Sequence, residues 1–159
     1  DKGSVESKLS EVDEVTRAES ELHFLSRAYK NYQPEKESSR FANRSFFSTA
    51  WCKLIPKECI NGQRFDTNIK RGEDSIFMYA ISWKVKHVKV TAPNCIYYVR
   101  KRHNSAGRRN ISIVTKIYEF LSQSSKYTGM YLRHLTHNDP LFYLSRIAGT
   151  FYNKFIQQH

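Results

Sequence analysis

Apolar residues recur at helical spacing in several stretches of the chain, and this pattern predicts its main elements. Residues 5–32 are expected to form a helix, with a break within 11–20, where apolar residues are scarce. Further helices are expected over 74–84, over 111–133 and over about 141–156. Each should bury one apolar face against the rest of the chain.

The same spacing predicts which side chains of the last three helices form the core. In 74–84 the predicted core residues are Ile76, Phe77, Tyr79, Ala80 and Trp83. In 111–133 they are Ile113, Ile117, Phe120, Leu121 and Tyr131. In 141–156 they are Leu141, Leu144, Ile147, Phe151 and Phe155.

Alternating and β-branched positions predict a few short strands. Residues 87–93 and 95–102 are expected to be strands joined at Pro93, and the aromatic segment 45–55 is expected to be a strand or a buried turn. The chain is therefore predicted to be of the α/β class, helix-rich with a few short strands.

Short polar and proline-containing segments separate these elements. Loops are expected at 33–40 and 103–110, a short helix at 56–60, a turn at 61–63, and a helix break at 136–140. No internal repeat interrupts this order.

Composition adds limits on size and compartment. With 159 residues, 40% of them hydrophobic, the chain is long enough for one domain with a core, and no apolar run approaches the roughly 20 residues of a membrane span. Cys52, Cys59 and Cys95 cannot all pair within one chain and match no zinc-binding pattern. We expect reduced thiols and a cytoplasmic protein.

The net charge of +11 indicates an anionic partner. Acidic residues concentrate in residues 1–21, so the remainder of the chain is strongly basic. Nucleotide phosphates, nucleic acid and anionic lipid headgroups all satisfy such a surface, and charge alone does not choose among them.

An acidic pair, Glu73 and Asp74, follows a glycine and opens the predicted helix, with Lys70 and Arg71 just before it. One interpretation is structural, because a helix N-terminus favours negative charge. The other is catalytic, because a carboxylate held at a helix start can act as a general base. The two interpretations are compatible.

The segment 97–109 combines several arginines with a histidine, a serine and a glycine. It is either a solvated basic loop or an anion clamp, in which Arg100 and Arg102 would bind phosphate oxygens with His103 or Ser105 beside them. Gly107 would let such a loop close over a ligand.

Other candidate residues have simpler interpretations. Trp51 is expected in the core rather than as a ligand platform, and Lys53 and Arg64 are bases near aromatic residues. His134 and His137 lack the further ligands that a metal site needs, so we expect a solvated helix end and no metal site.

Taken together, residues 48–107 resemble the second half of bacterial family 2 glycosyltransferases, which have the GT-A fold. The family pattern runs Trp-Asn-Lys-Leu, a short helix, Arg-Phe, then Gly-Glu-Asp-x-x-Phe, and about twenty residues later Tyr-Tyr-x-Arg and a serine. The matching residues are Trp51, Lys53, Leu54, Arg64, Phe65, Gly72, Glu73, Asp74, Phe77, Tyr97, Tyr98, Arg100 and Ser105. Cys52 departs from the pattern, because the family usually has Asn there.

The resemblance implies an inverting sugar transfer. Asp74 would be the base that takes the proton of an acceptor hydroxyl, and Glu73 would orient the site. The basic loop, with Arg100 and Arg102 and with His103 or Ser105, would stabilise the leaving nucleotide diphosphate. The segment of Trp51, Lys53 and Arg64 would contact the acceptor or support the site.

The resemblance also implies that a nucleotide-binding, sheet-bearing first half with a D-x-D motif is missing here. We expect an N-terminal helical segment over 1–45, the acceptor-side part of the catalytic domain over 46–110 and a helical pair over 111–159. The full enzyme would bind Mn²⁺ or Mg²⁺ through the missing half, whereas this fragment alone would bind no metal and be inactive.

The expected partners are a nucleotide sugar and a glycan or lipid-linked acceptor, at the inner face of the membrane, without nucleic acid. A second copy is a candidate to cover an exposed sheet edge. The alternatives are a basic nucleic-acid-binding module, or a non-catalytic membrane-surface or scaffold domain formed by 111–159.

Overall fold

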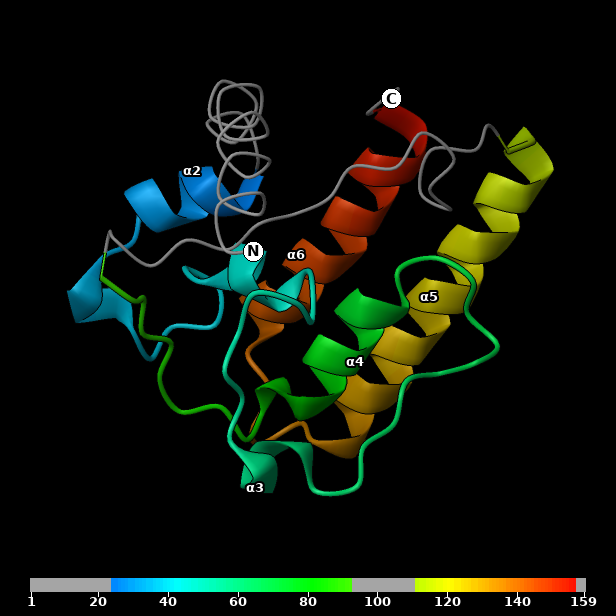
Figure 1. The fold of residues 1–159 in the computed structure, drawn as a ribbon. Coiled ribbons are helices and arrows are strands. Elements are labelled where there is room, and N and C mark those ends of the chain that lie inside the picture. Colours follow the sequence, from blue (N-terminus) through cyan, green and yellow to red (C-terminus); the bar gives the residue numbers. More distant parts are fainter. Residues whose placement is uncertain (1–23, 93–110, 157–159) are drawn as a thin grey trace, which may run out of the picture.

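The computed structural model describes residues 24–92 and 111–156, and these form a helical structure (Figure 1). Its elements in chain order are α2 (Phe24–Lys30), η1 (Pro34–Lys36), η2 (Arg44–Phe47), α3 (Lys57–Ile60), α4 (Glu73–Ser82), α5 (Ile113–Arg133), α6 (Pro140–Phe151) and η4 (Tyr152–Ile156). Here η1 and η2 are 3₁₀ turns and η4 is a π-helical turn that continues α6.

The helices lie close to their predicted positions. α4, α5 and α6 begin within one residue of 74–84, within two of 111–133 and within one of 141–156. The short predicted helix after Pro56 is α3, and it ends in the predicted turn, where Asn61 and Gly62 have φ values of 38° and 77°. Of the long helix expected over 5–32, the described part is α2.

The described residues contain no strand, so the α/β expectation is confirmed only as far as the chain is helix-rich. Segment 45–55 forms the end of η2 and then bends, so it is a turn rather than a strand, with Phe47 buried in it. The strand predicted over 87–93 is wrong for residues 87–92, and the one over 95–102 lies outside the described residues.

Tyrosine hydroxyl groups explain why residues 87–92 do not pair as a strand. Tyr32 Oη donates to the carbonyl oxygen of Val88 at 2.6 Å, and Tyr29 Oη donates to that of Thr91 at 2.8 Å. The backbone amide of Val88 donates to the carbonyl of Glu37 at 2.8 Å. These carbonyls therefore bond to side chains of α2 and its loop, where a sheet would use a neighbouring strand.

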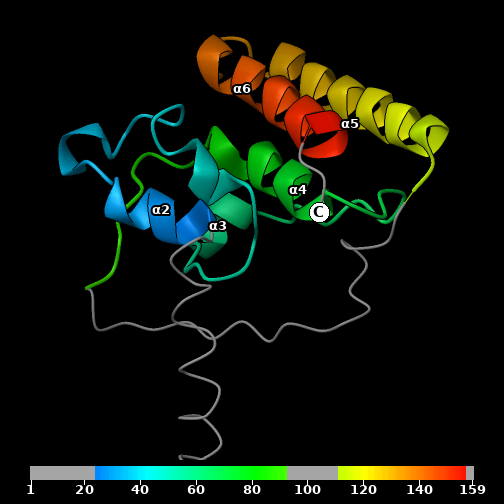
Figure 2. The same cartoon turned by 90° about the horizontal axis from the view of Figure 1, so that it is seen from above.

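Helices α5 and α6 form an antiparallel hairpin that covers one side of α4, and α2 and α3 lie on the other side (Figures 1 and 2). Ser112 Oγ accepts from the amide of Thr115 at the start of α5. Asp139 caps α6 by accepting from the amides of Leu141 and Phe142 at 2.9 and 3.3 Å.

The core is built around α4. Of the predicted core residues, Ile76, Phe77 and Tyr79 are buried, whereas Ala80 and Trp83 are only partly buried. The ring of Tyr79 stacks on Phe142 of α6 at 5.4 Å and meets Tyr127 of α5 edge-on at 5.1 Å. Aromatic contacts thus join α4 to both helices of the hairpin.

The predicted core faces of α5 and α6 are in large part wrong. Ile113, Ile117 and Leu121 are 59%, 46% and 60% exposed, whereas α5 buries Gln123 and Tyr127 against α4. In α6 the predicted residues Leu141, Leu144 and Phe151 are likewise exposed, and Phe142 and Thr150 are buried. Both helices carry apolar residues on two sides, so spacing alone identified the wrong one.

Candidate functional site

The acidic pair stands at the start of α4, and a glycine sets the backbone there. Gly72 has φ +80°, and a Cβ added to it would lie 3.2 Å from the amide group of Gln123. Gln123 Nε2 in turn donates to the carbonyl oxygen of Arg71 at 2.6 Å. The backbone just before the pair, at Arg71, is therefore held by α5, more than 50 positions away in the sequence.

Both carboxylates are available to a ligand. Glu73 and Asp74 occupy the first two positions of α4 and are partly exposed. Within residues 24–92 and 111–156, neither carboxylate has a hydrogen-bond or ion-pair partner, and neither caps the helix. Among the described residues, nothing therefore prevents their oxygen atoms from accepting the proton of a ligand.

Lys53, from the Trp-x-Lys-Leu segment, lies near enough to Asp74 for their charges to interact. Its ammonium group donates to Thr49 Oγ1 and to the carbonyl oxygen of Trp51, each at 3.0 Å. Burial lowers the pKa of Lys53, and the neighbouring side chains of Cys52 and Asp74 oppose that shift. The loop after η2 thus places the partly buried ammonium group of Lys53 near the carboxylate of Asp74.

The Arg-Phe segment packs against the same helix. The ring of Phe65 stacks on Phe77 with centroids 4.3 Å apart, one helical turn beyond the acidic pair. Arg64 itself is exposed. Trp51 is partly exposed, so its predicted place in the core is only partly correct.

A polar network that sequence reasoning missed supports the start of α4. Ser75, the residue after Asp74, has its hydroxyl 2.6 Å from Tyr127 Oη. Arg146 of α6 donates to Ser75 Oγ, and also to Ser48 Oγ and the carbonyl of Arg44, both at 3.1 Å. No motif spacing signals these contacts, because they join three helices far apart in the sequence.

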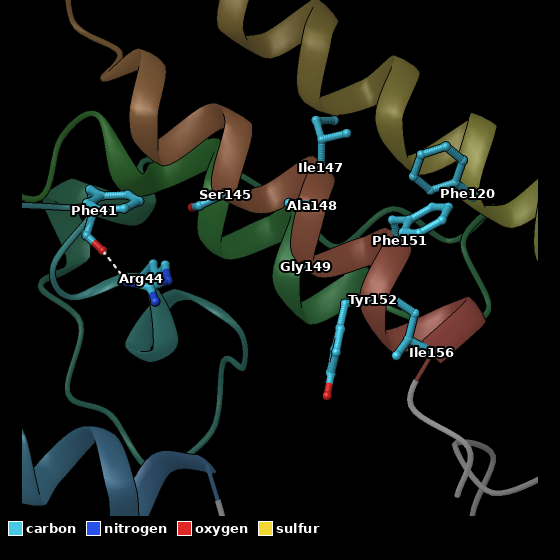
Figure 3. A pocket seen from close by; sticks show the side chains of 10 residues that line it. All are labelled: Phe41, Arg44, Phe120, Ser145, Ile147, Ala148, Gly149, Phe151, Tyr152 and Ile156. Atoms are coloured by element: carbon cyan, nitrogen blue, oxygen red, sulfur yellow. Dashed lines mark hydrogen bonds between the residues drawn. The ribbon is translucent and has the colours of Figure 1, made fainter.

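A shallow apolar groove of about 720 Å³ lies beside this network, between the η2 segment and the α6–η4 helix (Figure 3). Arg44 stands on one side of it, with its guanidinium 5.0 Å from the ring of Phe41. Its lining residues are Phe41, Arg44, Phe120, Ser145, Ile147, Ala148, Gly149, Phe151, Tyr152 and Ile156. Nothing in the sequence pattern predicted this groove.

The other candidate residues separate into two groups. The donor-loop residues Arg100, Arg102, His103 and Ser105 lie outside the described residues. His134 was expected at a solvated helix end, but its ring stacks on Trp83 with centroids 4.5 Å apart and is partly buried. The described ranges hold no group of three His, Cys, Asp or Glu residues placed to bind a metal.

Comparisons with known proteins do not extend this picture. No protein-family model, no curated protein and no solved structure matches the chain. None of the helices in the described ranges has the length and apolar character needed to cross a membrane. What the described residues offer a ligand is an acidic pair at the start of α4 that has no partner among them, with Lys53 near Asp74.

Proposed function

We propose that the chain is the acceptor-side part of an inverting, family 2-like glycosyltransferase of the GT-A fold. The observation that carries the proposal is the convergence of its three motif segments at α4. Lys53 of the Trp-x-Lys-Leu segment lies in the field of Asp74, and Phe65 of the Arg-Phe segment stacks on Phe77.

The geometry suits Asp74 as the general base. It is held on a helix whose start is fixed by Gly72 and Gln123, and its carboxylate is unpaired among the described residues. In the proposed step, Asp74 takes the proton of an acceptor hydroxyl while that oxygen forms a bond to the anomeric carbon. The bond from this carbon to the nucleotide diphosphate breaks, and the diphosphate leaves with the electron pair.

Charged groups are assigned both to the acceptor and to the leaving nucleotide diphosphate. Lys53 provides a positive charge near the carboxylate of Asp74. Glu73, also free, would hold the acceptor through a second hydroxyl. Stabilisation of the leaving group is assigned to the 97–109 loop. The residues described here do not fit a metal site, so any Mn²⁺ or Mg²⁺ would belong to another part of the enzyme.

The departure from the family pattern at Cys52 is also consistent with the proposal. Cys52 has φ 59°, in the left-handed region, where a residue other than glycine is strained. Asn is the side chain that tolerates this region best after glycine. The position at which the family usually has Asn is thus one where this backbone favours Asn.

The direct test is release of nucleotide diphosphate by the longest native chain that contains these residues. It would be incubated with a panel of nucleotide sugars and Mn²⁺ or Mg²⁺, at the cytoplasmic pH where we propose it works. Asp74→Asn should lower kcat by ~10²–10⁴-fold with an unchanged melting temperature. Glu58→Gln, an exposed acid on α3, is the matched control and should keep full activity.

Other outcomes would contradict the proposal. Equal release by the wild type and Asp74→Asn would remove Asp74 from the role of base. Absence of release with every donor would argue against sugar transfer. Steeply salt-dependent binding to any DNA or RNA, unaffected by Asp74→Asn, would favour a nucleic-acid-binding module instead.

A further inference from the structure

The groove between the η2 segment and the α6–η4 helix has the size and lining of a small-molecule site (Figure 3). Its volume of about 720 Å³ lies within the roughly 300–1,000 Å³ of ligand pockets, which combine an apolar lining with a few polar groups. Phe41, Phe151, Tyr152 and Ile156 line it and are between 38% and 56% exposed. The acidic pair is not among its described lining residues, so the groove would be a second site.

Two features of the α6–η4 helix shape this groove. Gly149 lines it, and a Cβ added there would meet nothing within 4 Å, so a larger side chain at this position would enter open space. Directly after α6 the backbone forms the π-helical turn η4, from which Tyr152 and Ile156 line the groove. Such turns are rare within helices and are frequent at functional sites.

Arg44 is the one charged side chain among the described residues that line the groove. Its guanidinium lies 5.0 Å from the ring of Phe41, and its Nη1 donates to the carbonyl oxygen of Phe41 at 3.2 Å. Within residues 24–92 and 111–156, no carboxylate pairs with it. Because a guanidinium has five N–H donors arranged as a fork, several remain for a ligand.

The surroundings of Arg44 do not cancel its charge. Arg146 donates from Nη1 to the carbonyl oxygen of Arg44 at 3.1 Å, and it too has no carboxylate partner in the described ranges. Glu119, which precedes a lining residue in the sequence, is ion-paired with Lys154 at 2.7 Å. The groove therefore combines an apolar lining with positive charge at its η2 side.

We propose that the groove binds a single-chain fatty carboxylate, with the hydrocarbon chain along the apolar lining and the carboxylate on Arg44. The fork of a guanidinium binds a carboxylate through two parallel hydrogen bonds. A head group with a single negative charge balances the one guanidinium that lines the groove, whereas a phosphate monoester carries nearly two negative charges. A neutral apolar ligand would gain nothing from Arg44, and a cationic ligand would be repelled by it.

Calorimetric titration tests this proposal without any nucleotide sugar, so its result is independent of the proposed sugar transfer. The probes are decanoate, 1-decanol, decyltrimethylammonium and acetate. Decanoate should bind the 159-residue chain with one-to-one stoichiometry. Decanol and decyltrimethylammonium, which have the same chain without the carboxylate, should bind at least roughly tenfold more weakly. Acetate, which lacks the chain, should not bind measurably.

Arg44→Gln should weaken the binding of decanoate by roughly tenfold and leave that of decanol unchanged, because only the carboxylate contacts the guanidinium. Arg133→Gln is the control, since it removes the same charge from an exposed position on α5. It should bind both ligands as the wild type does. If Arg44→Gln weakened decanol as much as decanoate, the loss would come from the shape of the groove, and recognition of the carboxylate would be overturned.

Gly149→Leu should fill part of the groove and weaken the binding of both decanoate and decanol. Gly129→Leu on α5 is the matched control, because a Cβ added to Gly129 also meets nothing within 4 Å but Gly129 does not line the groove. Neither variant should lower the melting temperature, since leucine is the better helix former. Absence of saturable decanoate binding, or unchanged binding by Gly149→Leu, would overturn the proposal. So would self-association that Gly149→Leu abolishes while decanoate does not bind, because a second copy would then occupy the groove.

Discussion

At the scale of single residues, two positions with unusual backbone conformation lie next to the candidate residues, one before the acidic pair and one before Lys53. Gly72 and Cys52 both adopt positive φ values, of 80° and 59°. Glycine adopts such values at no steric cost, whereas a Cβ makes them unfavourable by ~1–2 kcal/mol. Strain is therefore concentrated at Cys52, next to the lysine that lies near Asp74.

Replacing Cys52 with Asn is expected to stabilise the protein. Asn relieves part of the left-handed strain, so the free energy of unfolding should rise by roughly 0.5–1 kcal/mol, measured by urea denaturation. Cys52→Ser removes the thiol but keeps a residue poorly suited to this backbone, so it should change stability little. If Ser stabilised as much as Asn, loss of the thiol rather than relief of strain would be the cause.

At the scale of elements, sequence patterns located the helices but could not orient all of them. For α4, three of the five predicted core residues, Ile76, Phe77 and Tyr79, are buried. α5 carries both an outer stripe containing Leu121 and an inner side containing Tyr127, and the inner side includes the polar Gln123. A rule that places apolar residues inside chooses the stripe, because the hydrogen bond that makes Gln123 suitable for burial is a tertiary contact.

The same contact makes the start of α4 sensitive to a single methyl group. Gly72→Ala should destabilise the protein by more than the ~1–2 kcal/mol of backbone strain, because the new Cβ would press on the Gln123 amide at 3.2 Å. Gly62→Ala is the matched control: Gly62 has φ +77° but nothing within 4 Å of the added Cβ. Equal losses for the two variants in urea denaturation would show that the contact with Gln123 is unimportant.

At the scale of the whole molecule, sequence patterns proposed candidate residues but could not predict the contacts that hold them in place. Asp74 and Lys53 were proposed from the order and spacing of nearby residues, and their roles stay predictions. Tyr127 and Arg146 bond to Ser75 across 52 and 71 positions, and no local pattern reports a contact at that separation. The α5–α6 hairpin thus stabilises the start of α4, where the proposed site lies.

A second long-range link, between Lys126 of α5 and Asp66 before α4, gives the fold a testable pH dependence. The hydrogen bond from Lys126 is the main cause that lowers the pKa of Asp66 below its ordinary 3.8. Because the folded-state pKa is depressed, this stabilisation is fully present above about pH 3.8 and is lost as pH falls through the lower folded value. Lys126→Met should therefore be less stable than the wild type at pH 7.

The difference in unfolding free energy between Lys126→Met and the wild type should shrink as pH falls below 3.8, because protonation of Asp66 removes the same interaction in the wild type. Arg133→Met is the control on the same helix: Arg133 is exposed and has no ion-pair partner among the described residues, so its variant should show no such convergence. Urea denaturation from pH 7 down to pH 3 measures both differences. A constant gap for Lys126→Met across that range would mean that its effect comes from packing of the lysine stem, and that the link between α5 and the segment before α4 is not electrostatic.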